Sequence, residues 1–218
     1  MRATLHAGLH TVRGHATLLS VLVITMLYGM SSEALSRLTP LHLLDDIGLP
    51  SRFTEATWFG LLHAGASLGG AVVTWLLSQT TALRHPRRIV QLLLALTTVM
   101  LLATLLFALA DVLWLALSAV WITRWMRIAM RPLVVAWVNR GLTPGVRATV
   151  LSMFGQAEAL GEICGGPLLG LVGTLYTVNT ALVGAAVVLL PALPLYGRVL
   201  CHSTQGEDEA QIADFSDT

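Results

Sequence analysis

The sequence predicts an all-α integral membrane protein, a bundle of six membrane-spanning helices. Three observations support this fold class: the chain is apolar, its apolar residues fall into six long segments, and its arginines gather in alternate loops. Hydrophobic residues make up 55% of the 218 residues and charged residues only 11%, with a mean hydropathy of +0.74. Soluble domains carry about 25% charged residues, so this chain has too little charge to cover a water-exposed surface.

Six segments approach the roughly 20 apolar residues that cross the hydrocarbon core of a bilayer as one helix. The predicted spans are His15–Leu35, Thr57–Gln79, Ile89–Ala110, Val112–Val135, Arg147–Gly173 and Asn179–Tyr196. Residues 1–14 then form an N-terminal arm and residues 15–197 the membrane bundle. The acidic residues 198–218 form a tail that we expect to be disordered.

The arginines orient the predicted bundle. All 13 basic residues are arginine, and the loops on one side hold only Arg37 and Arg52. The arginine-rich side holds Arg2, Arg13, Arg84, Arg87, Arg88, Arg131, Arg140, Arg147 and Arg198. Because cytoplasmic loops carry an excess of Lys and Arg, this pattern predicts that both termini are cytoplasmic. An even number of spans agrees with that orientation.

The predicted fifth span carries two glutamates, Glu158 and Glu162, one helical turn apart. Their spacing puts them about 40° apart on one helix face. A carboxylate inside lipid is costly, so both should face a protein interior or a water-filled path. Arg124 and Arg127 of the fourth span lie at matching depths, and consecutive antiparallel spans are expected to be neighbours. We therefore expect these arginines to face Glu162 and Glu158, respectively, across an internal seam.

These four charges allow three interpretations. Permanent ion pairs would only dock the helices, whereas pairs that open could handle a proton or a substrate. In the third interpretation the charges are simply exposed at the cytoplasmic interface, where Arg131 is expected to extend its guanidinium toward the headgroups. Two neighbouring carboxylates are unfavourable unless arginines neutralise them. A group that exchanges a proton within the bilayer is the minimum part of a proton-coupled transporter.

Further candidates lie on the first and fifth spans. Glu33 and Arg37 are four residues apart, which fits a local helix pair or an outer gate that contacts a substrate. Tyr28 on the same helix would join that gate. On the fifth span, Met153 and Gln156 either line a cavity or form polar contacts between helices. We treat all five as candidates for substrate contact or gating.

The end of the fifth span is rich in glycine, which allows another backbone to approach closely. We expect a close-packed pivot there. Its members are Gly161, Gly165, Gly166, Pro167 and Gly170.

A second cluster of small residues fits the G-x-S-x-G pattern of serine hydrolases. It contains Gly65, Ser67 and Gly69, with Gly70 beside it and His63 one turn earlier. A nucleophile elbow requires a strand-to-helix turn, so we interpret these residues as a packing face. No cysteine or histidine spacing fits a metal site or a disulfide framework. We expect neither enzymatic activity nor a cofactor.

The segment Ala136–Gly170, AWVNRGLTPGVRATVLSMFGQAEALGEICGGPLLG, resembles the tenth-to-eleventh helix region of the major facilitator superfamily. The likeness is to bacterial drug-efflux members, in which a W-x-N…RAT-x-x-S-M…Q…A-L-G…G-G-P-x-x-G pattern recurs. Gly161–Gly170 also looks like the repeat-related counterpart of that family's antiporter signature. The loop Leu83–Arg88 resembles a degraded form of the basic turn between its eighth and ninth helices. Many relatives carry Gln where this chain has Glu162.

The resemblance implies a fold equivalent to the C-terminal six-helix half of a major facilitator protein. Complete members have two six-helix halves, with substrate bound near the midplane between them. It further implies proton-coupled efflux of a small molecule or drug by alternating access in a bacterial plasma membrane. The first and fourth spans would line the cavity. The implied partners are the lipid bilayer, the small-molecule substrate and a separate or missing N-terminal half.

The alternative is a non-transporting protein, either a truncated remnant or an accessory membrane subunit. Nucleic acid is not an expected partner, because the arginines lie between apolar segments and not on one soluble face.

Overall fold

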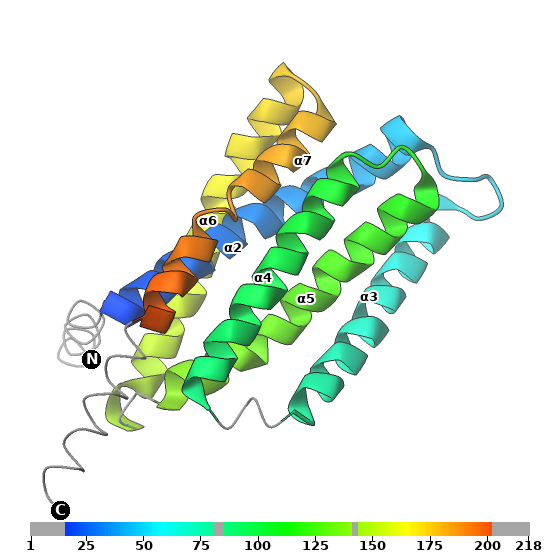
Figure 1. Ribbon diagram of the computed structural model, residues 1–218. Helices are drawn as coiled ribbons and strands as arrows, with labels where there is room; N and C mark the ends of the chain where they lie inside the picture. The colour runs from blue at the N-terminus through cyan, green and yellow to red at the C-terminus, as the bar shows by residue number, and fades with distance from the viewer. Residues whose placement is uncertain (1–15, 81–84, 141–143, 202–218) are drawn as a thin grey trace, which may run out of the picture.

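The computed structural model describes residues 16–80, 85–140 and 144–201, and every regular element within them is helical (Figure 1). The expected N-terminal arm and most of the expected tail lie outside these residues. The elements are α2 (Ala16–Leu41), the π-helix η1 (His42–Ile47), α3 (Glu55–Ser78), α4 (Pro86–Ala108), α5 (Leu113–Arg140), α6 (Pro144–Leu175) and α7 (Val178–Val187). After a turn at 188–191, the chain is again helical from 192 to 201. The all-helical class is confirmed for the described residues.

Four helical segments are long and apolar enough to cross a membrane, judged by length and composition. They are Thr17–Ile47, Glu55–Ser78, Pro86–Ala108 and Val178–Cys201. Helices α5 and α6, with 28 and 32 residues, have the required length. They are not among the four, because their arginines and glutamates lower their hydropathy. Membrane spanning is therefore supported for four segments and stays a prediction for α5 and α6.

The first helix is longer than its predicted span. It does not end at Leu35 but continues into η1, and the helical segment reaches Ile47. The reason is that the residues after Leu35 still present an apolar side to the core, where Leu38 and Leu43 are buried. Gly48 ends this helical run with a φ of 76°, a conformation that glycine adopts without steric cost.

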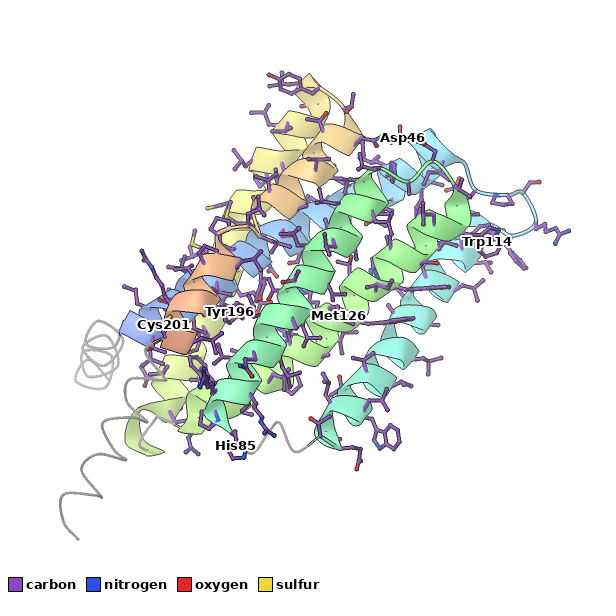
Figure 2. The ribbon with its side chains drawn as sticks, viewed as in Figure 1. Asp46, His85, Trp114, Met126, Tyr196 and Cys201 are labelled. Atoms are coloured by element: carbon purple, nitrogen blue, oxygen red, sulfur yellow. The ribbon has the colours of Figure 1, made fainter. Side chains whose placement is uncertain are left out.

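The helices form two groups (Figure 1). Helices α2, α6 and α7 lie together, while α5 packs between α3 and α4 in the second group. α7 joins the groups, because it packs against α4 as well as against α2 and α6. Asp46 and Trp114 lie toward one end of the bundle, and His85 and Cys201 lie toward the other (Figure 2). Successive helices therefore run in opposite directions between these two ends.

Helix α6 packs most closely on α2, and it touches α5 only slightly. The expectation that α5 and α6 are packed neighbours is wrong, because order in the chain does not decide which helices present small residues to each other. A Cβ added at Gly161 would overlap the carbonyl oxygen of Met26, and one at Gly165 would overlap the backbone of Met30. On α2, a Cβ at Gly29 would overlap the α6 backbone. Gly161 and Gly165 thus form the close crossing expected of small residues.

The other members of the expected pivot do not meet the α2 backbone. A Cβ at Gly166 would come within 3.1 Å of side-chain atoms of Glu33 and Arg37, so this residue borders a charged pair. Nothing lies within 4 Å of the Cβ position of Gly170, and Pro167 is exposed. The reason is helical geometry, since nine residues rotate Gly170 about 180° away from the face that contacts α2.

Small residues of α3 make room for two indole rings of α5. The rings of Trp121 and Trp125 are stacked with centroids 6.5 Å apart, and their Nε1 groups donate to α3 carbonyl oxygens at 3.0 and 2.9 Å. A Cβ at Gly65 or Gly69 would overlap these rings. The interpretation of this stretch as a packing face is confirmed for the glycines. Ser67, in contrast, is exposed and takes no part in the contact.

Candidate functional site

Arg127 of α5 lies at the centre of an ion-pair cluster. Its Nη2 is 2.8 Å from Oε1 of Glu158 and 3.8 Å from Oε1 of Glu162. Arg131, one turn further along α5, places its Nη2 3.4 Å from the second carboxylate oxygen of Glu158. The expected pairing of Arg127 with Glu158 is confirmed. The expected pairing of Arg124 with Glu162 is not found among the described residues, where Arg127 takes that place.

The same guanidinium also contacts α2. Arg127 donates from Nη1 to the backbone carbonyl oxygen of Tyr28 at 3.0 Å, so one side chain joins α2, α5 and α6. A planar guanidinium with several fixed donors suits such a three-sided contact. This reach explains how α5 and α6 interact although their backbones hardly meet. The charged contact therefore spans a gap that helix packing leaves open.

Tyr28, a candidate gate residue, takes part in a short chain of hydroxyl groups. Its phenolic oxygen is 2.5 Å from Oγ1 of Thr97 and 3.1 Å from the hydroxyl of Tyr196. Thr97 donates to the carbonyl oxygen of Leu93 at 2.6 Å. Thr97 must then accept from Tyr28, and Tyr28 accepts from Tyr196. Thr97 and Tyr196 could not be predicted from the sequence, because one hydroxyl on an apolar helix leaves no periodic signal.

Two cavities meet at Arg127. The first has a volume of about 160 Å³ and is lined mainly by α2 and α5, with Met100 and Phe107 of α4. It lies toward the Asp46 end of the bundle, and we call it the Arg124 cavity. The second, of about 250 Å³, lies toward the opposite end and is lined more by apolar side chains; we call it the Phe154 cavity. Tyr28, Met100 and Arg127 line both. The two hollows therefore adjoin at these three residues and lie one after the other along the bundle.

The Arg124 cavity brings several of the expected residues together. It is lined by Tyr28, Glu33, Arg124, Arg127 and Glu162. Most of its wall comes from α2 and α5, the first and fourth long helices in the described chain. The two helices expected to line a substrate cavity thus do line a hollow within the bundle, and its use by a substrate stays a prediction. Arg124 and Glu162, which lie at matching depths in the sequence-based prediction, both border this one cavity, although no ion pair joins them.

Glu33 and Arg37 form the local pair that their spacing predicts. Arg37 Nε lies 2.6 Å from Glu33 Oε1, and the Arg37 side chain is 67% exposed. Both residues also border a surface hollow of about 320 Å³ between α2 and α6, together with Glu162 and Pro167. Glu33 thus lies between this hollow and the Arg124 cavity.

Met153 and Gln156 take no part in either cavity. Met153 is partly buried and packs against a small apolar cluster that includes Val21, Val150 and Phe154. Gln156 is exposed on the surface of α6. These residues were expected either to line a cavity or to form polar contacts between helices. Met153 does contact other helices, but the contact is apolar. The candidate site is therefore built from α2, α5 and the two glutamates of α6.

His42 is a buried polar residue that the sequence analysis missed. Its side chain is 1% exposed; Nδ1 lies 2.8 Å from Oδ2 of Asp46, and Nε2 lies 3.1 Å from the carbonyl oxygen of Phe107. The imidazole also meets the Phe107 ring edge-on at 4.9 Å. The available signal was a histidine four residues before an aspartate within an apolar run. His42 fastens the end of the first helix to α4.

Replacing His42 by Phe should lower the free energy of unfolding by about 1 kcal/mol, because the aromatic contact survives and the hydrogen bonds do not. Asp46→Asn should cost less, since the Asp46 side chain is 41% exposed. Chemical unfolding of the purified protein in detergent measures both values. A loss for Asp46→Asn as large as that for His42→Phe would contradict the assignment of the main contact to Phe107.

The geometry provides charge pairs, hydroxyl groups and space inside a helical bundle. No family model, curated protein or solved structure matches the chain. The described residues contain no group of three or more side chains that could hold a metal ion. What the site can do is bind a polar molecule in a cavity and exchange partners among the arginines and glutamates at its border.

Proposed function

We propose that this chain is one half of a proton-coupled transporter that exports a small molecule, equivalent to the C-terminal half of a major facilitator protein. The observation that carries the proposal is the position of Arg127, which lines both cavities and pairs with Glu158 of the Phe154 cavity and, at 3.8 Å, with Glu162 of the Arg124 cavity. Alternating access requires a binding region that opens to one side of the membrane at a time. A cluster of charged side chains where two hollows adjoin is suited to that task.

The cost of the charges supports a functional reason for them. Charged side chains within a bilayer are expensive, and they mark substrate or ion pathways in membrane proteins. Apolar residues would dock α6 on α5 without that cost. Arg127 and the two glutamates can instead exchange partners when a proton arrives or leaves. In this proposal Glu162, the more weakly paired carboxylate at 3.8 Å, is the group that takes up the proton.

The exposed side of the cluster supports the need for a second half. The side chains of Arg131, Arg37 and Glu162 are 74%, 67% and 42% exposed. Exposed charges are costly against lipid, so a partner protein or water must cover these side chains. A six-helix N-terminal half, as in the family that the sequence resembles, is the proposed cover. The bundle would lie in a bacterial plasma membrane with both termini cytoplasmic.

The transport proposal is tested by expressing the chain with and without a candidate N-terminal half, a protein of six further spans. Efflux of a fluorescent dye from cells is the measurement, with an empty vector as the control. Efflux above the control in the combined strain is the expected result. If neither strain exceeds the control, the chain is a non-transporting remnant or an accessory subunit.

Glu162→Gln should abolish the dependence of efflux on the transmembrane pH gradient, because the amide cannot take up a proton. Glu55→Gln, at the exposed start of α3, is the matched control and should leave the pH dependence as in the wild type. Efflux measured at a series of external pH values separates the two. An unchanged pH profile in Glu162→Gln would assign a purely structural role to this carboxylate.

A further inference from the structure

The ion pairs around Arg127 leave one arginine without a partner. Arg37, Arg127 and Arg131 each lie within 4 Å of a glutamate oxygen. Within the described part of the chain Arg124 forms no ion pair and no hydrogen bond, although its side chain lines the Arg124 cavity. The four arginines of this region face three glutamates, which are Glu33, Glu158 and Glu162. One positive charge is therefore in excess, and it lies at the cavity wall.

A second observation marks the same cavity. Ser31 is 1% exposed, and its hydroxyl group has no hydrogen-bond partner in the described part of the chain. It also lines the Arg124 cavity, on the α2 side opposite α5. Buried polar groups in folded proteins are nearly always hydrogen-bonded, so an unpaired one needs an explanation. A ligand in the cavity would supply the missing partner for Ser31 and the missing charge for Arg124.

We propose that the Arg124 cavity binds an organic carboxylate, with Arg124 pairing the carboxylate group and Ser31 donating a hydrogen bond to the ligand. The fork of a guanidinium matches the two oxygens of a carboxylate. A single excess charge fits a monoanion better than a phosphate ester, which carries about −1.5 to −2. Leu35, Met100 and Phe107 line the same cavity and would contact the apolar body of the ligand. The proposal rests on the transport function above and names the class of its substrate.

Binding can be tested on the purified full chain in detergent, without the partner half. Benzoate is the probe and benzamide is its neutral counterpart of the same shape. A ligand that binds the folded state raises the midpoint of thermal unfolding in proportion to its occupancy. Benzoate should raise the midpoint of the wild-type chain in a saturable way, and benzamide should not. Equal effects of the two, or no effect of benzoate, would overturn the proposal.

Variants assign the effect to the cavity. Arg124→Gln should raise the benzoate concentration for half-maximal effect at least tenfold, and Ser31→Ala should raise it severalfold. Arg124→Lys should retain part of the affinity, because it keeps the charge but loses the fork. The matched control is Arg52→Gln, in the exposed loop before α3, which should bind as the wild type does. Wild-type benzoate binding by Arg124→Gln would overturn the assignment even if the protein binds benzoate elsewhere.

Two further additions identify the anion. Inorganic phosphate should have no effect at the concentration at which benzoate saturates, and an equal effect would overturn the organic carboxylate. Phosphatidylglycerol in the micelles should leave the benzoate effect unchanged relative to phosphatidylcholine. If phosphatidylglycerol abolishes that effect, the site holds a lipid headgroup and the proposal fails. Carboxylate binding without efflux would contradict the transport function alone, whereas efflux without carboxylate binding would contradict this inference alone.

Discussion

Gly161→Ala is expected to force α2 away from α6 and to destabilise the protein by about 1–3 kcal/mol, the range for overpacked cores. The added methyl group would meet the carbonyl oxygen of Met26, a backbone atom that cannot rotate away. The effect opposes the helix propensity of alanine, which favours the variant by about 1 kcal/mol. Unfolding of the purified protein in detergent, followed by circular dichroism, measures the net change.

The matched control is Gly170→Ala in the same helix. Its added methyl group meets nothing within 4 Å, so only the propensity remains and the variant should be stabilised by up to about 1 kcal/mol. The two substitutions are chemically identical, yet their effects on the free energy of unfolding should have opposite signs. The same sign in both would contradict the close crossing at Gly161.

Arg127→Gln is expected to lower the free energy of unfolding by about 3 kcal/mol. Breaking a buried ion pair costs about 3–5 kcal/mol because one charge stays behind without a partner. The lower end applies here, since the side chains of Arg127 and Glu158 are 30% and 20% exposed. The transport proposal adds that efflux should be lost as well, because Arg127 would no longer hold Glu158 where the two cavities adjoin.

Two further variants distinguish the effect of breaking the Arg127–Glu158 ion pair from the effect of removing an arginine in general. Arg124→Gln removes an arginine one turn away that has no partner among the described residues, so the stability of the ligand-free protein should not fall. The double variant Arg127→Gln with Glu158→Gln removes both charges and should recover most of the lost stability, but not efflux. If the double variant is less stable than Arg127→Gln, the two residues do not interact as the 2.8 Å distance indicates.

The sequence predicted the charged site in part. Depth along two antiparallel helices was enough to pair Arg127 with Glu158, because the rise per residue of a helix is constant. The same reasoning assigned Glu162 to Arg124, which the structure does not bear out. The reason is that a long arginine side chain can reach two carboxylates one turn apart, as Arg127 does. The depth of a residue along its helix does not predict which arginine two such carboxylates will share.

The glycine-rich end of α6 shows the same limit. A stretch of small residues indicates that some close contact exists, and two of its glycines make that contact. Gly170 belongs to the same stretch but points away from α2. Which members of a cluster serve the contact depends on the face that the neighbouring helix occupies, and that face is set by the packing of the whole bundle.

The sequence by itself determined the helical, membrane class of this protein, because composition and segment length follow from the solvent that surrounds the chain. It also determined the residues that are too polar to face lipid, since the charge of a side chain is given by its residue type. The tertiary structure alone decided that α6 packs on α2, that Arg127 lines two cavities, and that Arg124 and Ser31 line one of them without a partner among the described residues. These facts depend on contacts between residues far apart in the chain. Such contacts arise from the fit of one helix surface to another, which no local pattern records.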